Sequence, residues 1–144
     1  MKTSALFLSL FLLTGLACKD KLDKSCDANF LEADVNNVFW QAEEVTGFSF
    51  GVGGNITIQA KANFGQVREI GIQVPMDVTT GTYQLQTGVF LHSIIVIPGA
   101  FQAETGELTI TVHDTTNKII KGTFFFSIPS EGLTVEAGSF CAKY

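Results

Sequence analysis

The sequence has 144 residues and a formal net charge of −5 at pH 7, with 9 basic against 14 acidic residues. No basic cluster stands anywhere in it, which excludes the charge pattern of a nucleic-acid-binding protein. The length suits one domain behind a short leader.

An apolar run opens the chain. Residues 5–17 (ALFLSLFLLTGLA) follow Lys2 without a single charge, and the run ends at Cys18, before a charged stretch. A membrane span needs about 20 apolar residues, and this run is shorter. A positive start followed by a short apolar run therefore predicts a cleaved export signal over residues 1–17.

The end of this run resembles the lipobox of bacterial lipoproteins, because the small residue Ala17 directly precedes Cys18. The resemblance implies that Cys18 becomes the lipidated first residue of the mature chain, and more than one acyl chain gives stable anchoring. We therefore expect an outer membrane lipoprotein that faces the periplasm or the cell surface. Simple secretion and a signal anchor remain the alternatives.

Residues 18–27 (CKDKLDKSCD) alternate acids and bases and offer almost nothing to bury, so they predict a short charged tether. Export brings the chain into an oxidising compartment, where thiols tend to pair. With Cys18 lipidated, Cys26 and Cys141 remain, one near each end of the domain, and we expect a disulfide between them. The alternative is a free Cys26 in the tether and a Cys141 that is simply small and buried.

Several runs within residues 28–144 show a period of two, with an apolar residue, mostly Ile, Val, Leu or Phe, at every second position, which is typical of half-buried antiparallel strands. Turn signals rich in Asn, Asp and Gly separate these runs. We expect a single all-β domain, an antiparallel meander of about eight to ten strands that closes into a small barrel, with a two-sheet β-sandwich as the alternative. The clearest runs are 54–64, 68–74, 81–86, 107–114 and 132–137.

Two segments break the alternation. Residues 93–98 (SIIVIP) are apolar on both faces, and in 122–129 (GTFFFSIP) Phe125 points away from Phe124 and Phe126. Both patterns predict strands covered on both sides, by a second sheet, a loop or a partner. The burial of Phe125 tests this expectation.

The order of the strand motifs resembles a family of small Bacteroidetes lipoproteins that is catalogued as a domain of unknown function. The resemblance spans nearly all of the mature domain and implies a small barrel or calycin-like sheet. It implies no catalytic residue, since none is assigned in the family. Its motifs are Trp40 with Ala42, and residues 81–83, 106–110, 122–126 and 138–140.

Residues for catalysis or metal binding do not cluster in the sequence. His92 and His113 each stand alone in a predicted strand, without the repeated ligand spacing of a zinc site, and Asp114 is expected to cap the following turn. Glu43 and Glu44 are adjacent on a strand and so point to opposite faces, and no serine lies in a nucleophile elbow. We expect no enzyme, no metal and no cofactor.

Aromatic side chains are the remaining candidates for a functional role. A small barrel is either filled by side chains or holds one small ligand, and the number of aromatics favours filling. A ligand mouth at Trp40, Phe48, Phe50 and Phe90 would accept an apolar molecule. We expect a lipid-anchored cell-envelope domain that acts by binding or as an envelope component, with a calycin-like carrier of a small hydrophobic ligand as the alternative. Candidate partners are the membrane, an envelope protein, a glycan or a small hydrophobic ligand, and not nucleic acid.

Overall fold

The computed structural model describes residues 26–50, 54–86, 93–97 and 100–144. The expected signal peptide, the expected lipid attachment site Cys18 and most of the expected tether lie outside these residues, as do Phe90 and His92. The strand expected over 93–98 forms as β7 (Ser93–Ile97).

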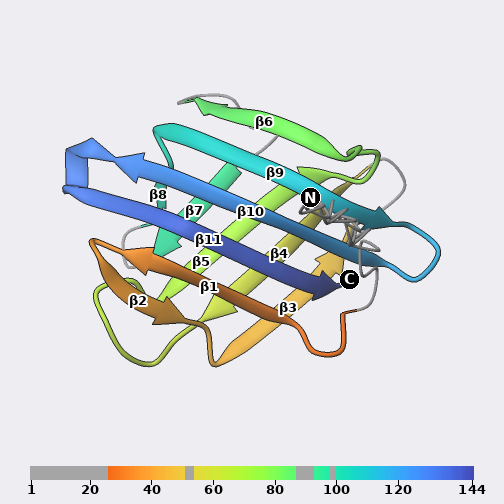
Figure 1. Cartoon of the computed structure of the whole chain (residues 1–144), viewed down its shortest axis with the longest axis horizontal. Coiled ribbons are helices and arrows are strands. Elements are labelled where there is room, and N and C mark those ends of the chain that lie inside the picture. Colours follow the sequence, from red (N-terminus) through yellow and green to blue (C-terminus); the bar gives the residue numbers. More distant parts are fainter. Residues whose placement is uncertain (1–25, 51–53, 87–92, 98–99) are drawn as a thin grey trace, which may run out of the picture.

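The described strands form two antiparallel sheets packed face to face, and Figure 1 shows their strands crossing at an angle. Sheet A has the order β2 (Val38–Gln41), β1 (Phe30–Val35), β11 (Leu133–Lys143), β10 (Ile119–Ile128), β9 (Thr105–Asp114) and β6 (Gly81–Gln86). Sheet B has the order β3 (Glu44–Ser49), β4 (Asn55–Lys61), β5 (Glu69–Pro75), β7 and β8 (Phe101–Gln102). A 3₁₀ turn, η1 (Pro129–Glu131), joins β10 to β11.

The all-β expectation is confirmed, but the expected closure into a barrel is not found among the described residues. Sheet A ends at β2 and β6, sheet B ends at β3 and β8, and no described strand pair joins the two sheets. The two-sheet alternative fits this arrangement. The chain is also not a simple meander, because β6 pairs with β9 in sheet A while β7 and β8 belong to sheet B.

Alternation of apolar and polar residues builds the core as expected. Inner-face side chains of both sheets interdigitate between the layers, while the intervening residues remain partly exposed. The largest fully buried side chains from sheet B are Ile56, Ile58, Ile70 and Ile72, and those from sheet A are Leu31, Leu108, Ile110, Ile120, Phe126, Ile128 and Phe140.

Phe125 is not covered, so the expectation of burial on both faces is wrong for β10 within the described chain. Phe124 and Phe126 are buried in the core, but the Phe125 side chain is 50% exposed on the opposite face of sheet A. The reason is architectural: sheet B covers one face of sheet A, and no described element lies over the other. A three-phenylalanine run alone does not distinguish these two situations.

The N-terminal end of the domain is fastened to its last strand. Cys26 and Cys141 form a disulfide across 115 residues, with 6.0 Å between their Cα atoms, which confirms the expected pairing. Both cysteines are buried beside Ile119. Asn29 adds a polar clamp, because its Oδ1 accepts a bond from the Lys143 backbone N–H of sheet A while its Nδ2 donates to the Val45 carbonyl of sheet B.

Candidate binding site

A hollow of about 680 Å³ opens at the edge of the sandwich, where β2 of sheet A meets the loop between β4 and β5 of sheet B. In Figure 1 this yellow-green loop passes beside β2. Among the described residues of the lining Glu43 is the only charged one, so the hollow suits a neutral or apolar molecule. Its lining consists of Val35, Asn36, Val38, Phe39, Trp40, Gln41, Glu43, Ala62, Phe64, Gly65, Gln66 and Val67.

The β1–β2 hairpin places Trp40 at the floor of the hollow. Asn36 and Asn37 both have positive φ, 48° and 63°, as a tight hairpin turn requires. Trp40 then lies opposite Ala33 and faces inward. Its indole N–H donates a 2.9 Å hydrogen bond to the Val67 carbonyl, so the floor joins the edge of sheet A to the β4–β5 loop.

Polar contacts hold the β4–β5 loop in place. The Asn63 side chain and backbone N–H donate to the Glu43 carboxylate, and the Arg68 guanidinium donates to the Asn63 carbonyl. Gly65 has φ +97°, a conformation that disfavours any side chain, and there the loop turns back toward Trp40. These contacts fix the wall of the hollow before any ligand arrives.

Large apolar side chains stand exposed at the rim. Val38, Phe39 and Phe64 are 67%, 63% and 80% exposed. Exposed apolar residues gathered around a hollow, as opposed to scattered singly, are typical of an interaction site.

Of the four residues expected at a ligand mouth, Trp40 lies in this hollow. Phe48 and Phe50 are not in its lining; their rings pack against each other edge to face, 5.2 Å apart. Phe90 lies outside the described residues. Sequence reasoning missed Phe39 and Phe64, yet one signal was available: neighbours on a strand point to opposite faces, so Phe39 had to be exposed if Trp40 was buried.

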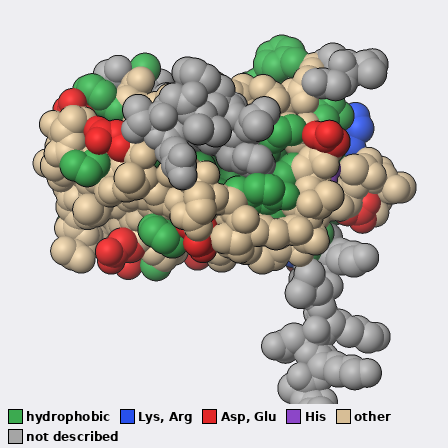
Figure 2. Space-filling model, turned by 90° about the horizontal axis from the view of Figure 1, so that it is seen from above, with side chains coloured by type: hydrophobic (Ala, Val, Ile, Leu, Met, Phe, Trp, Pro, Cys, Tyr) green, Lys and Arg blue, Asp and Glu red, His purple; other side chains and the backbone are tan. Residues whose placement is uncertain are grey.

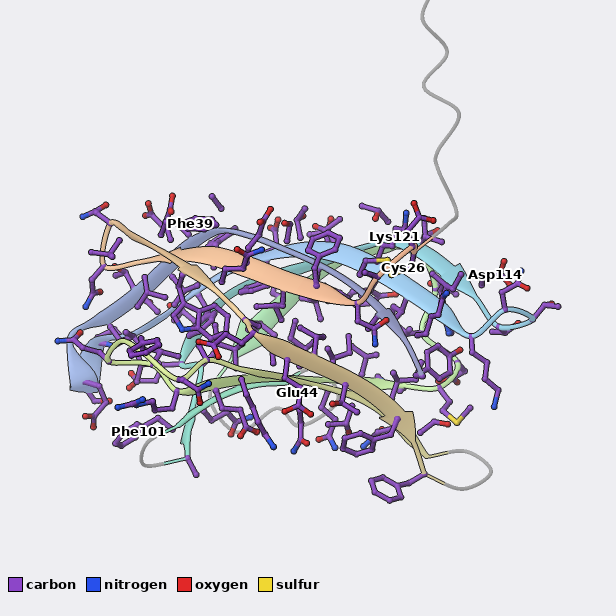
Figure 3. All side chains as sticks on the ribbon, turned by 90° about the horizontal axis from the view of Figure 1, so that it is seen from below. Cys26, Phe39, Glu44, Phe101, Asp114 and Lys121 are labelled. Atoms are coloured by element: carbon purple, nitrogen blue, oxygen red, sulfur yellow. A yellow bond between two sulfur atoms is a disulfide. The ribbon has the colours of Figure 1, made fainter. Side chains whose placement is uncertain are left out.

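The hollow lies away from Cys26, at the other end of β1. In Figure 3 Phe39 is labelled in the left part of the sandwich and Cys26 in the right part. Because β1 runs from the Cys26 end to the β1–β2 turn, its length separates the two.

His113 serves a structural contact in the described chain. Its Nδ1 lies 2.7 Å from the Val78 carbonyl oxygen and its Nε2 lies 2.8 Å from the Tyr144 hydroxyl. A carbonyl only accepts, so Nδ1 carries a proton, and the neutral ring accepts the Tyr144 proton at Nε2. Asp114 accepts bonds from the Thr116 and Asn117 backbone N–H groups, which confirms the expected turn cap.

Tyr144 makes the stability of the folded domain depend on pH in the alkaline range. Burial raises the pKa of its hydroxyl above the ordinary 10.0, and the negative charge of Asp114 raises it further. The unfolded chain therefore loses this proton first, and the Tyr144 contribution to stability, complete below pH 10, is lost as the pH rises toward the folded pKa.

We expect Tyr144→Phe to remove that alkaline loss and to lower stability at pH 7 by about 1 kcal/mol, because the bond to His113 is gone. Urea unfolding at a series of pH values from neutral to above 10 measures both effects. Asp114→Asn keeps the hydroxyl but removes one cause of the shift, so its alkaline loss should be smaller than that of the wild type. An unchanged alkaline slope in Tyr144→Phe would contradict the assignment.

Charge and metal ligands do not gather on the described surface. Figure 2 shows acidic side chains standing singly over the face seen from above. Among the described residues no group of three or more His, Cys, Asp or Glu is arranged to hold a metal ion. Nor does any helix within them have the length and apolar character that crossing a membrane requires.

The model of a family described as Domain of unknown function (DUF6252) matches residues 27–142. The match spans the two sheets from before β1 into β11 and thus includes the hollow. Neither a curated protein nor a solved structure matches the chain.

Proposed function

Because the chain belongs to the family described as Domain of unknown function (DUF6252), whose description assigns no activity, we propose a function from the chain's own residues: an exported, lipid-anchored binding protein of the cell envelope, without enzymatic activity. Cys18 would carry the lipid and hold the domain at the outer membrane, on its periplasmic or outer side. The family would then be one of small lipoproteins, as the resemblance to those of Bacteroidetes suggests.

The observation that best supports a binding role is the hollow of about 680 Å³ with Trp40 at its floor, called the Trp40 hollow below. Its volume of about 680 Å³ falls within the range of small-molecule sites, and its floor of Val35, Trp40 and Val67 is buried and apolar. The hollow also lies at the end of β1 that is far from Cys26, because Val35 and Asn36 line it. A domain anchored through its N-terminus would therefore hold the hollow away from the membrane.

The same hollow supports a second candidate, a carrier of a small hydrophobic ligand. A carrier differs from a receptor or envelope component in releasing a ligand that is taken up elsewhere. The apolar floor, and a described lining with Glu43 as its single charged residue, favour a neutral, apolar ligand for a carrier and for a receptor alike.

The sole tryptophan of the chain makes the hollow directly observable, because its emission reports on this site alone. N-phenyl-1-naphthylamine, a neutral apolar probe, should quench Trp40 emission saturably by energy transfer. Phe64→Ala removes an exposed rim ring without touching the core, and we expect it to weaken the probe about tenfold.

Phe50→Ala is the matched control, since it removes a similarly exposed ring that lies outside the hollow. Its probe affinity should equal that of the wild type. Quenching that does not saturate, or an equal loss in Phe50→Ala, would count against binding in the hollow.

Anchoring is tested separately by labelling cells with radioactive palmitate. We expect label in the wild type and in Cys26→Ser, and none in Cys18→Ser, because only Cys18 lies in the lipobox-like position. Cys18→Ser should also move from the membrane fraction to the soluble fraction. Label that persists in Cys18→Ser would refute the anchor.

A further inference from the structure

The outer face of sheet A carries a row of polar side chains that crosses all six strands. Each residue of this row lies directly opposite the next on the neighbouring strand, and each is at least partly exposed. In order from β6 to β2 the row consists of Thr82, Thr109, Thr123, Ser139, Glu32 and Gln41.

The next row on the same face contains aromatic rings among amide and acidic groups. Phe125 lies beside Glu107 on one side, and on the other side β11 contributes Glu136 at its bulge. Phe39 on β2 ends the row opposite Asp34. With strands about 4.8 Å apart, β10 and β2 place the two rings about 14 Å apart along the face.

A shallow hollow of about 290 Å³ lies where the two rows meet. The bulge in β11 lies at this hollow: Ala137 has φ 49°, and the Phe124 ring packs so closely on Gly138 that an added Cβ would lie 2.5 Å from it. The Phe125 side chain borders this depression. Its lining consists of Glu107, Thr109, Thr123, Phe124, Phe125, Ala137, Gly138 and Ser139.

Hydrogen bonds hold some of the polar groups around the hollow in place, and these groups can still make further hydrogen bonds. Ser139 Oγ donates to Glu32, and a Glu107 oxygen accepts from Gln84. The Thr123 hydroxyl makes no hydrogen bond to another described residue. A hydroxyl and a carboxylate each have capacity for further bonds, so the row offers donors and acceptors to an incoming molecule.

These features together select the chemistry of the ligand. A sugar ring presents apolar C–H groups on its faces, which pack on an aromatic ring, and hydroxyls at its edge, which bond to carboxylates and hydroxyls. Neither row contains Lys or Arg, which disfavours phosphate or anionic polymers as ligands. Lys121 lies beside Cys141, on the other side of the polar row from Phe125. The abundance of hydroxyl and carboxylate groups disfavours a lipid or an apolar protein surface.

We propose that the outer face of sheet A binds a neutral saccharide chain, with one sugar ring on Phe125, its hydroxyls bonded to the Thr123 and Glu107 side chains, and Phe39 engaging a further ring. In Figure 3 this face is at the top, where Phe39 and Lys121 are labelled. The site is separate from the floor of the Trp40 hollow and does not depend on that hollow binding anything.

Affinity electrophoresis of the detergent-purified full chain tests this proposal, in native gels that contain laminarin, xyloglucan or galactomannan. We expect at least one of these neutral polysaccharides to retard the wild type. Phe125→Ala should weaken retardation about tenfold, as truncating a central contact ring does. Thr123→Val keeps shape but removes a hydroxyl, and should weaken it severalfold.

Two control variants separate this site from others. Phe50→Ala, at an exposed ring outside sheet A, and Phe64→Ala, in the Trp40 hollow, should both bind polysaccharide like the wild type. The proposal is overturned if no neutral polysaccharide retards the chain, if only dextran sulfate does, or if Phe125→Ala is retarded like the wild type. It is also overturned if sedimentation shows that Phe125→Ala dissociates a dimer of this chain, because a second copy would then occupy the face.

Discussion

Cys26→Ser should lower the free energy of unfolding by about 4 kcal/mol. The disulfide closes a loop across 115 residues, and cross-linking a loop of that size removes about 4 to 5 kcal/mol of entropy from the unfolded chain. The Cys141 thiol left behind is 1% exposed and has lost its partner, so the native state gains nothing in return. For a domain of this size the loss is a large share of total stability.

Urea unfolding followed by circular dichroism measures this loss, and non-reducing mass analysis of a digest confirms the linkage in the wild type. Reduction of the wild type with dithiothreitol under mild denaturant should reproduce the stability of Cys26→Ser. Cys18→Ser, which removes a cysteine outside the bridge, should match the wild type. Equal unfolding midpoints for Cys26→Ser and Cys18→Ser would mean that the bridge does not stabilise the domain.

Much of the local structure was readable from the sequence, because it depends on residues close together in the chain. The period of two over 54–64 and 68–74 predicts β4 and β5 and their inner faces, and each buries the expected isoleucines. The pairing of Cys26 with Cys141 followed from counting the cysteines that remain after Cys18. A local pattern was enough to predict the strands, and a small number of possible pairings was enough to predict the disulfide.

Pairing between distant strands was not readable in this way. Alternation states which face of a strand is buried but not which strand lies beside it, so it does not distinguish a closed barrel from two sheets. The same limit explains Phe125: its direction, away from Phe124 and Phe126, was predicted correctly, but the predicted cover over it was wrong. Exposure there depends on whether another part of the chain returns over sheet A.

The candidate hollow was predicted only in part for the same reason. Trp40 was singled out as one of four aromatic residues at an expected ligand mouth, but Phe64 reaches the hollow through a loop of the other sheet. The bond from the Trp40 indole to the Val67 carbonyl joins residues 27 positions apart, and no periodic signal encodes it. Nothing in the sequence distinguished Phe48 and Phe50 from Trp40 as aromatic residues of a ligand mouth. In the structure they pack against each other and do not line the hollow.

Gly122 makes the distant pairing of sheet A testable, because its neighbours come from two other strands. An added Cβ would lie 2.3 Å from the Thr109 carbonyl oxygen of β9 and 2.8 Å from ring atoms of Phe140 on β11. Neither neighbour is a flexible chain end, so strands in the core must shift to admit a methyl group. We expect Gly122→Ala to lower the free energy of unfolding by about 3 kcal/mol.

Gly132→Ala is the control that separates crowding from backbone strain. Gly132 has φ +62°, which costs an L-residue about 1 kcal/mol, but an added Cβ there meets nothing within 4 Å. Urea unfolding of both variants should therefore show Gly122→Ala as clearly the more damaging. If the two losses are equal, the tight contact of β10 with β9 and β11 is absent, and the order of sheet A must be wrong at its centre, because only direct neighbours bring those atoms so close to Gly122.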